Sequence, residues 1–250
     1  MITVSIVSHG HGPMVGRLAS NILKFPEVKK IILTLNIPEF IEIPKDSRID
    51  LIQNITPKGF GANHNQAFSS CDTNFFCVLN PDITFDNNPF SFLLNSVVDK
   101  QVGLVAPMVK NLNGAIEDSA RKFITPLSVL RRRLFGYRDS YEFQEKDPSF
   151  FAEWVGGMCM LFQTSAYLKL GGFDEEYFMY VEDADICARL WEGGYRVIVC
   201  PNAIVFHQAH RASRHNLQHL GWHAASLCRY FSRYWNRVQH ISQKIELLNE

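Results

Sequence analysis

The 250-residue sequence lacks the features that mark secreted and membrane-spanning proteins. Its six cysteines include no Cys-x-x-Cys pair, so we expect free, buried thiols in a reducing compartment. The start, MITVSIVSHG, has neither the basic region nor the long apolar run of a signal peptide. No apolar run approaches the ~20 residues that a membrane-spanning helix requires. The sequence therefore predicts a cytoplasmic protein that is soluble or peripheral on the inner face of the membrane.

The sequence also has no net charge, since 25 Lys and Arg balance 25 Asp and Glu. This balance excludes a protein that binds nucleic acid through a broad excess of cations. Internal repeats and low-complexity linkers are absent as well. Hydrophobic residues make up 46% and aromatic residues 12% of the chain, which is enough for a full core and excludes extended disorder.

Short apolar runs alternate with amphipathic segments in the first half of the chain, which predicts a parallel β-sheet with helices on both faces. Such a sheet binds ligands beyond the carboxyl ends of its strands. The polar residues that end the runs are therefore expected to lie along one rim. The expected strands are 2–8, 29–36, 48–54 and 74–80, and the expected helices are 14–25 and 61–71.

The second half is less regular. A hairpin is expected over 110–123, with its turn at Asn113-Gly114, and 124–153 is the most loop-like part of the chain. From about residue 215 the chain is expected to be helical. The other expected helices are 89–99, 164–172 and 183–194, and the other expected strands are 102–109, 157–163, 195–201 and 203–207.

One apolar run stops at Asn80-Pro81-Asp82, so a carboxylate follows a buried strand directly. Proline fixes its own φ angle and restricts the residue before it. Asp82 is therefore expected to be held at the ligand-binding rim, where a metal ion or a charged ligand needs a fixed acid.

A glycine-rich loop, Gly10-His11-Gly12 followed by Gly16, links the first strand to the first helix. This is the setting of a dinucleotide-binding loop, but the spacing is GxGxxxG rather than GxGxxG. The second strand also ends at Asn36 instead of the acid that would bind a ribose. An NAD-dependent oxidoreductase is therefore a weak alternative.

The strongest signal is the acidic segment 171–194, GGFDEEYFMYVEDADICARLWEGG. Glu182, Asp183 and Asp185 fall at the start of a predicted helix, where free N–H groups stabilise negative charge. A structural role is one alternative, with an acid as N-cap and Asp185 paired with Arg189 at i,i+4. A catalytic role is the other alternative, because neighbouring aromatic residues would shield these acids from water. A partly desolvated acid beside other acids has a raised pKa and can accept a proton. These aromatic residues are Tyr177, Phe178, Tyr180 and Trp191.

Taken together, these segments resemble the inverting family 2 glycosyltransferases, especially their rhamnosyltransferase-like branch, which carries Asn-Pro-Asp in place of Asp-x-Asp. The resemblance spans roughly residues 2–215. It implies a GT-A fold: an α/β domain with a mostly parallel central sheet, flanking helices and a C-terminal helical tail. The implied domain is 1–214, with a nucleotide-sugar-binding half at about 1–109 and an acceptor-binding half at 110–214, followed by a helical extension at 215–250. The matching segments are 171–197, 58–85, 154–162 and 203–213.

The resemblance also implies roles for individual residues. Asp183, beside Glu182, matches the general base, and Asp82 and His207 match the ligands of a divalent metal, Mg²⁺ or Mn²⁺. Three positions depart from the family pattern: Asn36 replaces an acid, Lys58 replaces an asparagine, and His9-Gly10-His11 replaces Tyr-Asn. The residues expected to bind the nucleotide sugar are Ser8, His9, Asn36, Gly61, Asn65, Asn80, Trp154, Gly157 and Arg211.

The implied activity is inverting transfer of a sugar from a nucleoside diphosphate donor to a saccharide or lipid-linked acceptor. The branch implies L-rhamnose from dTDP-rhamnose, in bacterial surface-polysaccharide synthesis such as that of O-antigen. A UDP-hexose donor is the enzymatic alternative. A sugar-binding protein that has lost turnover is the non-catalytic alternative.

The C-terminal stretch 222–240 combines an apolar stripe with Arg229, Arg233 and Arg237 at intervals of four. Three interpretations stay open: packing against the catalytic domain, a homodimer contact, and a surface helix on an anionic membrane. His215, His219 and His223 share a helical face and permit a zinc site. No cysteine or acid spacing supports such a site.

Overall fold

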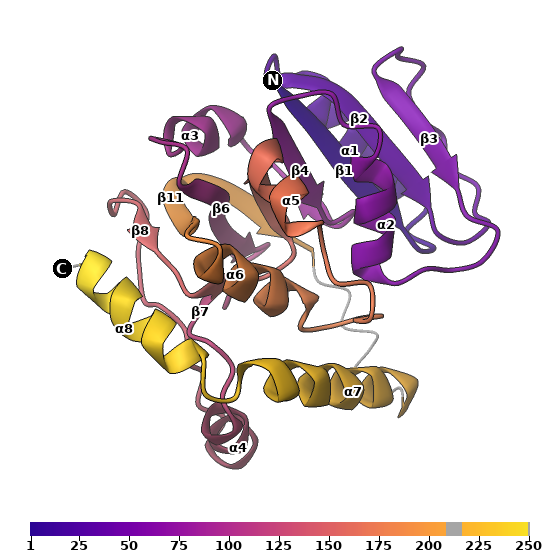
Figure 1. Ribbon diagram of the computed structural model, residues 1–250. Helices are drawn as coiled ribbons and strands as arrows, with labels where there is room; N and C mark the ends of the chain where they lie inside the picture. The colour runs from indigo at the N-terminus through magenta and orange to yellow at the C-terminus, as the bar shows by residue number, and fades with distance from the viewer. Residues whose placement is uncertain (209–216, 250) are drawn as a thin grey trace.

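The computed structural model describes residues 1–208 and 217–249. Within these residues, nine strands form one mixed sheet in the order β3-β2-β1-β4-β10-β6-β11-β5, with β8 pairing to β11 (Figure 1). The strands are β1 Ile2–Ser8, β2 Val28–Leu35, β3 Ile49–Gln53, β4 Phe75–Leu79, β5 Ile83–Thr84, β6 Val102–Asn111, β8 Phe150–Phe151, β10 Cys159–Gln163 and β11 Arg196–His207, and β7 Ala120–Arg121 pairs with β9 Trp154–Val155 in a separate ribbon.

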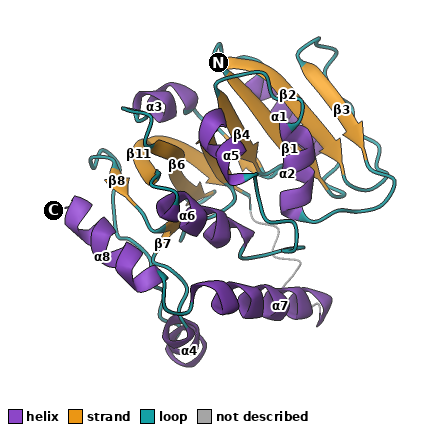
Figure 2. Cartoon of the chain, viewed as in Figure 1, coloured by secondary structure: helices purple, strands orange, loops and turns teal. Residues whose placement is uncertain are grey.

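Helices cover both faces of the sheet (Figure 2), as the alternation in the sequence predicts. The side chains of β4 alternate between the two faces: Phe76 and Val78 belong to one hydrophobic core, and Cys77 and Leu79 to the other. The helices are α1 Pro13–Ile22, α2 Phe60–Phe68, α3 Phe90–Asn95, α4 Pro126–Phe135, α5 Thr164–Leu170, α6 Glu182–Glu192, α7 Leu217–Tyr234 and α8 Val238–Asn249.

The first four strands, β3, β2, β1 and β4, are parallel, so their carboxyl ends meet at one rim. β10 then runs antiparallel between β4 and β6. β11 is parallel to β6, with a register shift between Cys200 and Ile204 around Pro201. The two strands expected over 195–207 are therefore one irregular strand, and the mostly parallel sheet is confirmed.

Two expectations for the middle of the chain need correction. The turn at Asn113-Gly114 is present, since the Gly114 N–H donates to the Asn111 carbonyl oxygen over 2.9 Å. The antiparallel return is short: Ile116 bridges to Lys110 of β6 and the Glu117 N–H donates to the Val109 carbonyl oxygen over 2.8 Å, whereas β7 further along the chain pairs with β9. The loop-like segment 124–153 contains α4, which a Thr125–Ser128 capping box starts and Gly136 stops with φ of 66°. Turn and capping residues thus define a helix in a segment whose weak hydrophobic pattern predicts a loop.

The C-terminal helices pack on the chain's own core. Tyr230 and Tyr234 of α7 are 0% and 1% exposed and belong to the same hydrophobic core as Trp191 of α6. This burial supports the first of the three interpretations of 222–240, because much of its apolar stripe is covered by the rest of the chain. Among the described residues, no helix is long and apolar enough to span a bilayer.

Candidate active site

A cleft of about 1500 Å³ opens beyond the carboxyl ends of the parallel strands. Asp82 lines it from the sheet side, and Asp183 lines it from the first turn of α6. The structure therefore brings together the two acids to which the sequence gives opposite roles. The predicted site residues that line the cleft are His9, Asn36, Asn80, Asp82, Trp154, Gly157, Glu182 and Asp183.

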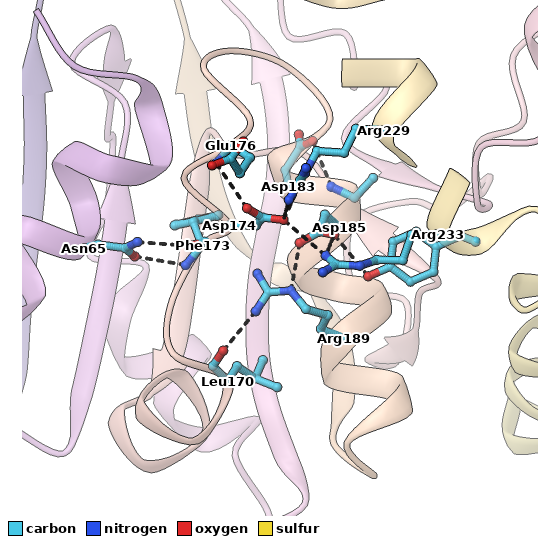
Figure 3. Close-up of polar contacts among 12 residues, drawn as sticks. Asn65, Leu170, Phe173, Asp174, Glu176, Asp183, Asp185, Arg189, Arg229 and Arg233 are labelled. Atoms are coloured by element: carbon cyan, nitrogen blue, oxygen red, sulfur yellow. Dashed lines mark hydrogen bonds and ion pairs between the residues drawn. The ribbon is translucent and has the colours of Figure 1, made fainter. Parts of the chain in front are cut away.

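Other predicted residues do not line this cleft. Ser8 is fully buried, and a Cβ at Gly61 would lie 2.6 Å from the Cβ of Phe173, so this glycine permits close packing. Asn65 is tied to the loop before α6: its Oδ1 accepts from the Phe173 N–H and its Nδ2 donates to the Phe173 carbonyl, each over 2.9 Å (Figure 3). Gly61 and Asn65 thus support the acidic loop from behind. Arg211 lies outside the described residues.

His207 lies behind Asp82. Antiparallel pairing of β11 with β5 sets His207 opposite Ile83, so its Nε2 is 3.1 Å from Asp82 Oδ2. Its Nδ1 is 2.8 Å from Oε2 of Glu117. Burial opposes the charged imidazole, but hydrogen bonds and charge from Asp82 and Glu117 raise the pKa of His207 to about 9.

The donor set at Asp82 fits a divalent cation. Asp82 Oδ1 is buried and has no hydrogen-bond partner among the described residues. His207 Nε2 and Asp82 Oδ2 lie 3.1 Å apart, so an imidazole nitrogen and a carboxylate oxygen, donors that Mn²⁺ accepts, are side by side. Among the described residues, no group of three or more His, Cys, Asp or Glu could hold a metal. The candidate donors at this point are therefore two, Asp82 and His207.

Asp183 is held by backbone groups. Its Oδ2 accepts from the Gly157 N–H over 3.1 Å, and its Oδ1 accepts from the Ala184 N–H over 2.9 Å. Burial raises the pKa of Asp183, while the charge of Arg121 and these hydrogen bonds oppose the rise. The carboxylate is thus fixed in direction and more basic than an exposed aspartate.

A strained turn aims this acid into the cleft. Tyr180 and Val181, immediately before α6, have φ angles of 70° and 68°. A left-handed conformation is costly for a β-branched residue such as valine and persists only where the surrounding structure holds it. The turn sets Glu182 and Asp183 on the cleft wall at the positive end of the helix.

Glu182 is 6% exposed, and its Oε2 is buried without a hydrogen-bond partner among the described residues. Burial, and next the charge of Asp183, raises the pKa of Glu182 well above the ordinary value. Burial thus disfavours two negative charges on this adjacent pair, since the pKa of each acid is raised.

The third acid of the segment, Asp185, is structural. It is fully buried, and its Oδ2 is 2.7 Å from Arg189 Nε, as the i,i+4 alternative predicts. Its Oδ1 accepts from Arg233 and from the Tyr234 hydroxyl of α7, each over 3.0 Å (Figure 3). Arg233 also contacts Asp174, so α7 is bound both to α6 and to the loop before it.

The backbone N–H groups of the glycine loop are hydrogen-bonded to a side chain of the same chain. The Gly10 and Gly12 N–H groups donate to the Glu39 carboxylate over 3.1 and 3.0 Å. These donors are therefore occupied, which argues against a dinucleotide diphosphate at this helix. Asn36 is similarly engaged: its Oδ1 accepts from the Lys58 N–H over 2.8 Å, and its Nδ2 donates to the Lys58 carbonyl over 2.9 Å.

Aromatic side chains form one wall of the cleft. Phe178 and Trp222 have ring centroids 4.7 Å apart, and the Tyr180 hydroxyl lies 2.7 Å from Nδ1 of His219. Of the aromatic residues expected to shield the acids, Phe178 and Tyr180 line the cleft, whereas Tyr177 and Trp191 are buried in the core. The suggested zinc site also included His215, which lies outside the described residues.

Three contributors escaped the sequence-based reasoning. Glu117 orients His207, Arg121 supplies a positive charge near Asp183, and Trp222 completes the aromatic wall. Glu117 and Arg121 follow the turn of the predicted hairpin and belong to no motif, and Trp222 falls in the apolar stripe predicted for the C-terminal helix. A conspicuous charge pattern marks none of them, so only the tertiary structure reveals their positions.

The comparisons with known proteins agree with this geometry. Residues 33–222 match the family described as glycosyltransferase like family 2. The chain is 29% identical over 250 residues to rhamnosyltransferase WbbL of Escherichia coli, a match that covers 93% of each protein. It is 30% identical over 159 residues to N-acetylglucosaminyl-diphospho-decaprenol L-rhamnosyltransferase of Mycobacterium tuberculosis, covering 60% of this chain and 52% of that relative. The chain thus spans about half the length of the mycobacterial relative.

Solved structures show the same fold. GalNAc-T7 with UDP, GalNAc and Mn²⁺ has a TM-score of 0.68 at 13% identity, covering 86% of this chain and 44% of that one. The mannosyltransferase PcManGT from Pyrobaculum calidifontis, with GDP-Man and Mn²⁺, has a TM-score of 0.62 at 14% identity, covering 99% and 70%. With the family match over 33–222, these likenesses show that the chain is a GT-A-fold glycosyltransferase and belongs to glycosyltransferase family 2.

Proposed function

We propose that this enzyme is an inverting rhamnosyltransferase that transfers L-rhamnose from dTDP-L-rhamnose to a lipid-linked saccharide in bacterial surface-polysaccharide synthesis. Two relatives carry the name rhamnosyltransferase, and the name of one specifies a diphospho-decaprenol acceptor. The observation that carries the proposal is that Asp82 and Asp183 line one cleft, since a donor and an acceptor must meet between them.

Asp82 and His207 are proposed to hold Mg²⁺ or Mn²⁺, which when bound neutralises the charge of the leaving diphosphate. Glu117 supports this role, because its contact with His207 Nδ1 leaves Nε2 directed at Asp82. Such outer partners orient the imidazole and make it a better ligand. GalNAc-T7 and PcManGT, which share the fold, were solved with Mn²⁺.

At the other side of the cleft, Asp183 is proposed to act as general base. It takes the proton from an acceptor hydroxyl while the oxygen of that hydroxyl attacks the anomeric carbon and the bond to the nucleoside diphosphate breaks. Attack on the face opposite the leaving group inverts the configuration. The Gly157 and Ala184 N–H groups fix the carboxylate for this transfer, and burial keeps its pKa raised.

Glu182 is proposed to stay protonated during turnover, so that only one negative charge faces the acceptor. A carboxylate at both positions would repel its neighbour in a poorly hydrated site. The unpaired Oε2 and the strongly raised pKa of Glu182 support this assignment. The two adjacent acids are thus proposed to have different roles, with Asp183 as the base and Glu182 as a neutral neighbour.

The acceptor is proposed to lie against the aromatic wall of Phe178, Tyr180 and Trp222. Aromatic rings stack on the apolar face of a sugar, and such walls with few polar groups are typical of small-molecule sites. The wall lies on the α6 and α7 side of the cleft, which is also the side of Asp183. An acceptor hydroxyl can therefore reach the base without crossing the donor site.

A donor screen tests the proposal. Thermal unfolding is measured with dTDP, UDP, dTDP-L-rhamnose, UDP-hexoses and NAD, each with and without Mn²⁺. The expected result is Mn²⁺-dependent stabilisation that is largest with dTDP-L-rhamnose, together with slow hydrolysis of that donor. Preference for a UDP-hexose would overturn the sugar assignment, and stabilisation by NAD alone would overturn the proposed activity. Donor binding without any turnover would favour a sugar-binding protein, against which the three residues Asp82, Asp183 and His207 argue.

A further inference from the structure

Helix α4, Pro126–Phe135, is well formed but has no buried residue. A capping box starts it and a left-handed glycine stops it, so both of its ends are defined by local interactions. Leu127, Leu130 and Leu134 are nevertheless 54%, 52% and 62% exposed. Figure 1 shows α4 at the lower edge of the molecule, below α7.

The exposed leucines form a stripe, because positions i, i+3 and i+7 lie on one face of a helix. At about 100° per residue, Arg131 falls on one flank of the stripe and Arg133 on the other. The opposite face is the one that meets the cleft, where Ser128, Val129 and Arg132 are lining residues. The leucine stripe therefore points away from the active site.

The surrounding segment is strongly basic. Residues 120–138 contain six Lys or Arg and no Asp or Glu, although the whole chain has no net charge. An apolar stripe between two arginines has the arrangement of a helix that lies in a membrane interface, with leucines among the acyl chains and arginines at the phosphates.

We propose that the outer face of α4, formed by Leu127, Leu130 and Leu134 between Arg131 and Arg133, docks on an anionic lipid bilayer. The positive charge of this face favours an anionic bilayer over a second copy of the chain. A two-fold contact would bring the same arginine-rich face of each copy together, which like-charge repulsion disfavours. Anionic headgroups instead neutralise the arginines while the leucines leave water.

Docking in this orientation would set the bilayer beside the cleft, because the two faces of α4 meet the membrane and the active site respectively. A lipid-linked acceptor could then enter the cleft with its lipid still in the bilayer. This consequence depends on the proposed function. The docking itself does not, so it can be tested without any glycosyl transfer.

The test is flotation of the full chain with vesicles of phosphatidylcholine alone and of phosphatidylcholine with phosphatidylglycerol, at low and high NaCl. We expect binding to the anionic vesicles only, weakened by salt. Replacing Leu127, Leu130 and Leu134 together by Ser should abolish binding. The R131Q/R133Q variant should weaken it by about fivefold for each arginine. Equal binding of the wild-type chain to neutral and anionic vesicles would overturn the proposal, and so would binding that both variants retain.

Matched controls separate the stripe from general surface effects. Leu168→Ser removes a 67% exposed leucine from α5, and K45Q/K100Q removes two exposed cations. Both controls should bind vesicles like the wild-type chain. Thermal unfolding should change little in the two α4 variants, because α4 contributes no buried residue, and little in the controls, because they alter exposed side chains. A wild-type dimer in light scattering that the leucine variant converts to monomer, without vesicle binding by either, would identify a second copy as the occupant and overturn the membrane assignment.

Discussion

The imidazole of His207 lies 2.8 Å from Glu117 on its Nδ1 side, and its Nε2 points at Asp82. If Glu117 orients a metal ligand, Glu117→Gln should weaken metal binding without removing a ligand. We expect the Mn²⁺ concentration for half-maximal activity to rise about 10–100-fold, with little change in kcat at saturating metal. Titration of activity with Mn²⁺ measures this shift.

The matched control is Glu142→Gln, which alters an exposed glutamate that lines the same shallow depression as Glu117. Its Mn²⁺ dependence should equal that of the wild-type enzyme. An unchanged Mn²⁺ dependence in Glu117→Gln would show that Glu117 only packs beside His207.

Glu182→Gln should stabilise the folded protein at pH values above the ordinary pKa of a glutamate. Burial and Asp183 raise the pKa of Glu182 in the folded state, so the native protein binds more protons than the unfolded chain. The free energy of unfolding of the wild-type protein therefore falls as pH rises above the ordinary value of 4.5. The variant lacks this loss and should be more stable by about 1–3 kcal/mol at mildly alkaline pH.

Urea unfolding across pH measures the difference between the wild-type protein and Glu182→Gln. The two curves should converge at acid pH, where the wild-type carboxyl is protonated in both states. The variant should also keep most of its turnover, since Glu182 is assigned no proton transfer. Loss of turnover comparable to that of a base variant would contradict the division of roles between the two acids.

The pH dependence of kcat/KM should report Asp183. Burial raises the pKa of this acid above the ordinary value of 3.8, so the acid limb of the profile should lie above the range of an exposed aspartate. The charge of Arg121 opposes the rise, and this side chain stacks 4.8 Å from the Trp154 ring centroid. Arg121→Met should therefore move the acid limb to still higher pH. A shift in the opposite direction would exclude Asp183 as the titrating base.

Arg233→Met should destabilise the protein by about 1–3 kcal/mol, because it leaves the fully buried Asp185 with one cation fewer. The control is Arg237→Met, which removes a 64% exposed side chain from a loose 3.5 Å pair with Glu192 and should cost under about 1 kcal/mol. Equal effects of the two substitutions in chemical denaturation would show that the network between α6 and α7 adds no stability.

Local patterns predicted most of the fold. Apolar runs with polar ends identified β1, β2, β3 and β4, and the strand exits located the rim that Asp82 occupies. The antiparallel entry of β10 between β4 and β6 was not predictable, because sheet order depends on pairings between distant segments. The apolar pattern of β10 is the same in either direction.

The acidic segment and Asn-Pro-Asp pointed to Asp183 and Asp82, and the structure places both on the wall of one cleft. Asn65 shows the limit of that reasoning: its motif suggested donor contact, yet its side chain is bonded to the loop at Phe173. Glu117 was missed for the converse reason. It belongs to an unremarkable turn, and only the pairing of β11 with β5 and β6 brings His207 to it.

Asp82 and Asp183 are proposed to have different roles on the two sides of one cleft, metal binding and proton transfer, and a paired measurement tests this division. Donor binding and turnover are measured side by side for Asp82→Asn and Asp183→Asn with dTDP-L-rhamnose and Mn²⁺. We expect Asp183→Asn to bind the donor normally while kcat falls about 10²–10⁴-fold, and Asp82→Asn to lose Mn²⁺-dependent donor binding. Normal turnover by Asp183→Asn, or Mn²⁺-dependent donor binding that survives in Asp82→Asn, would contradict this account.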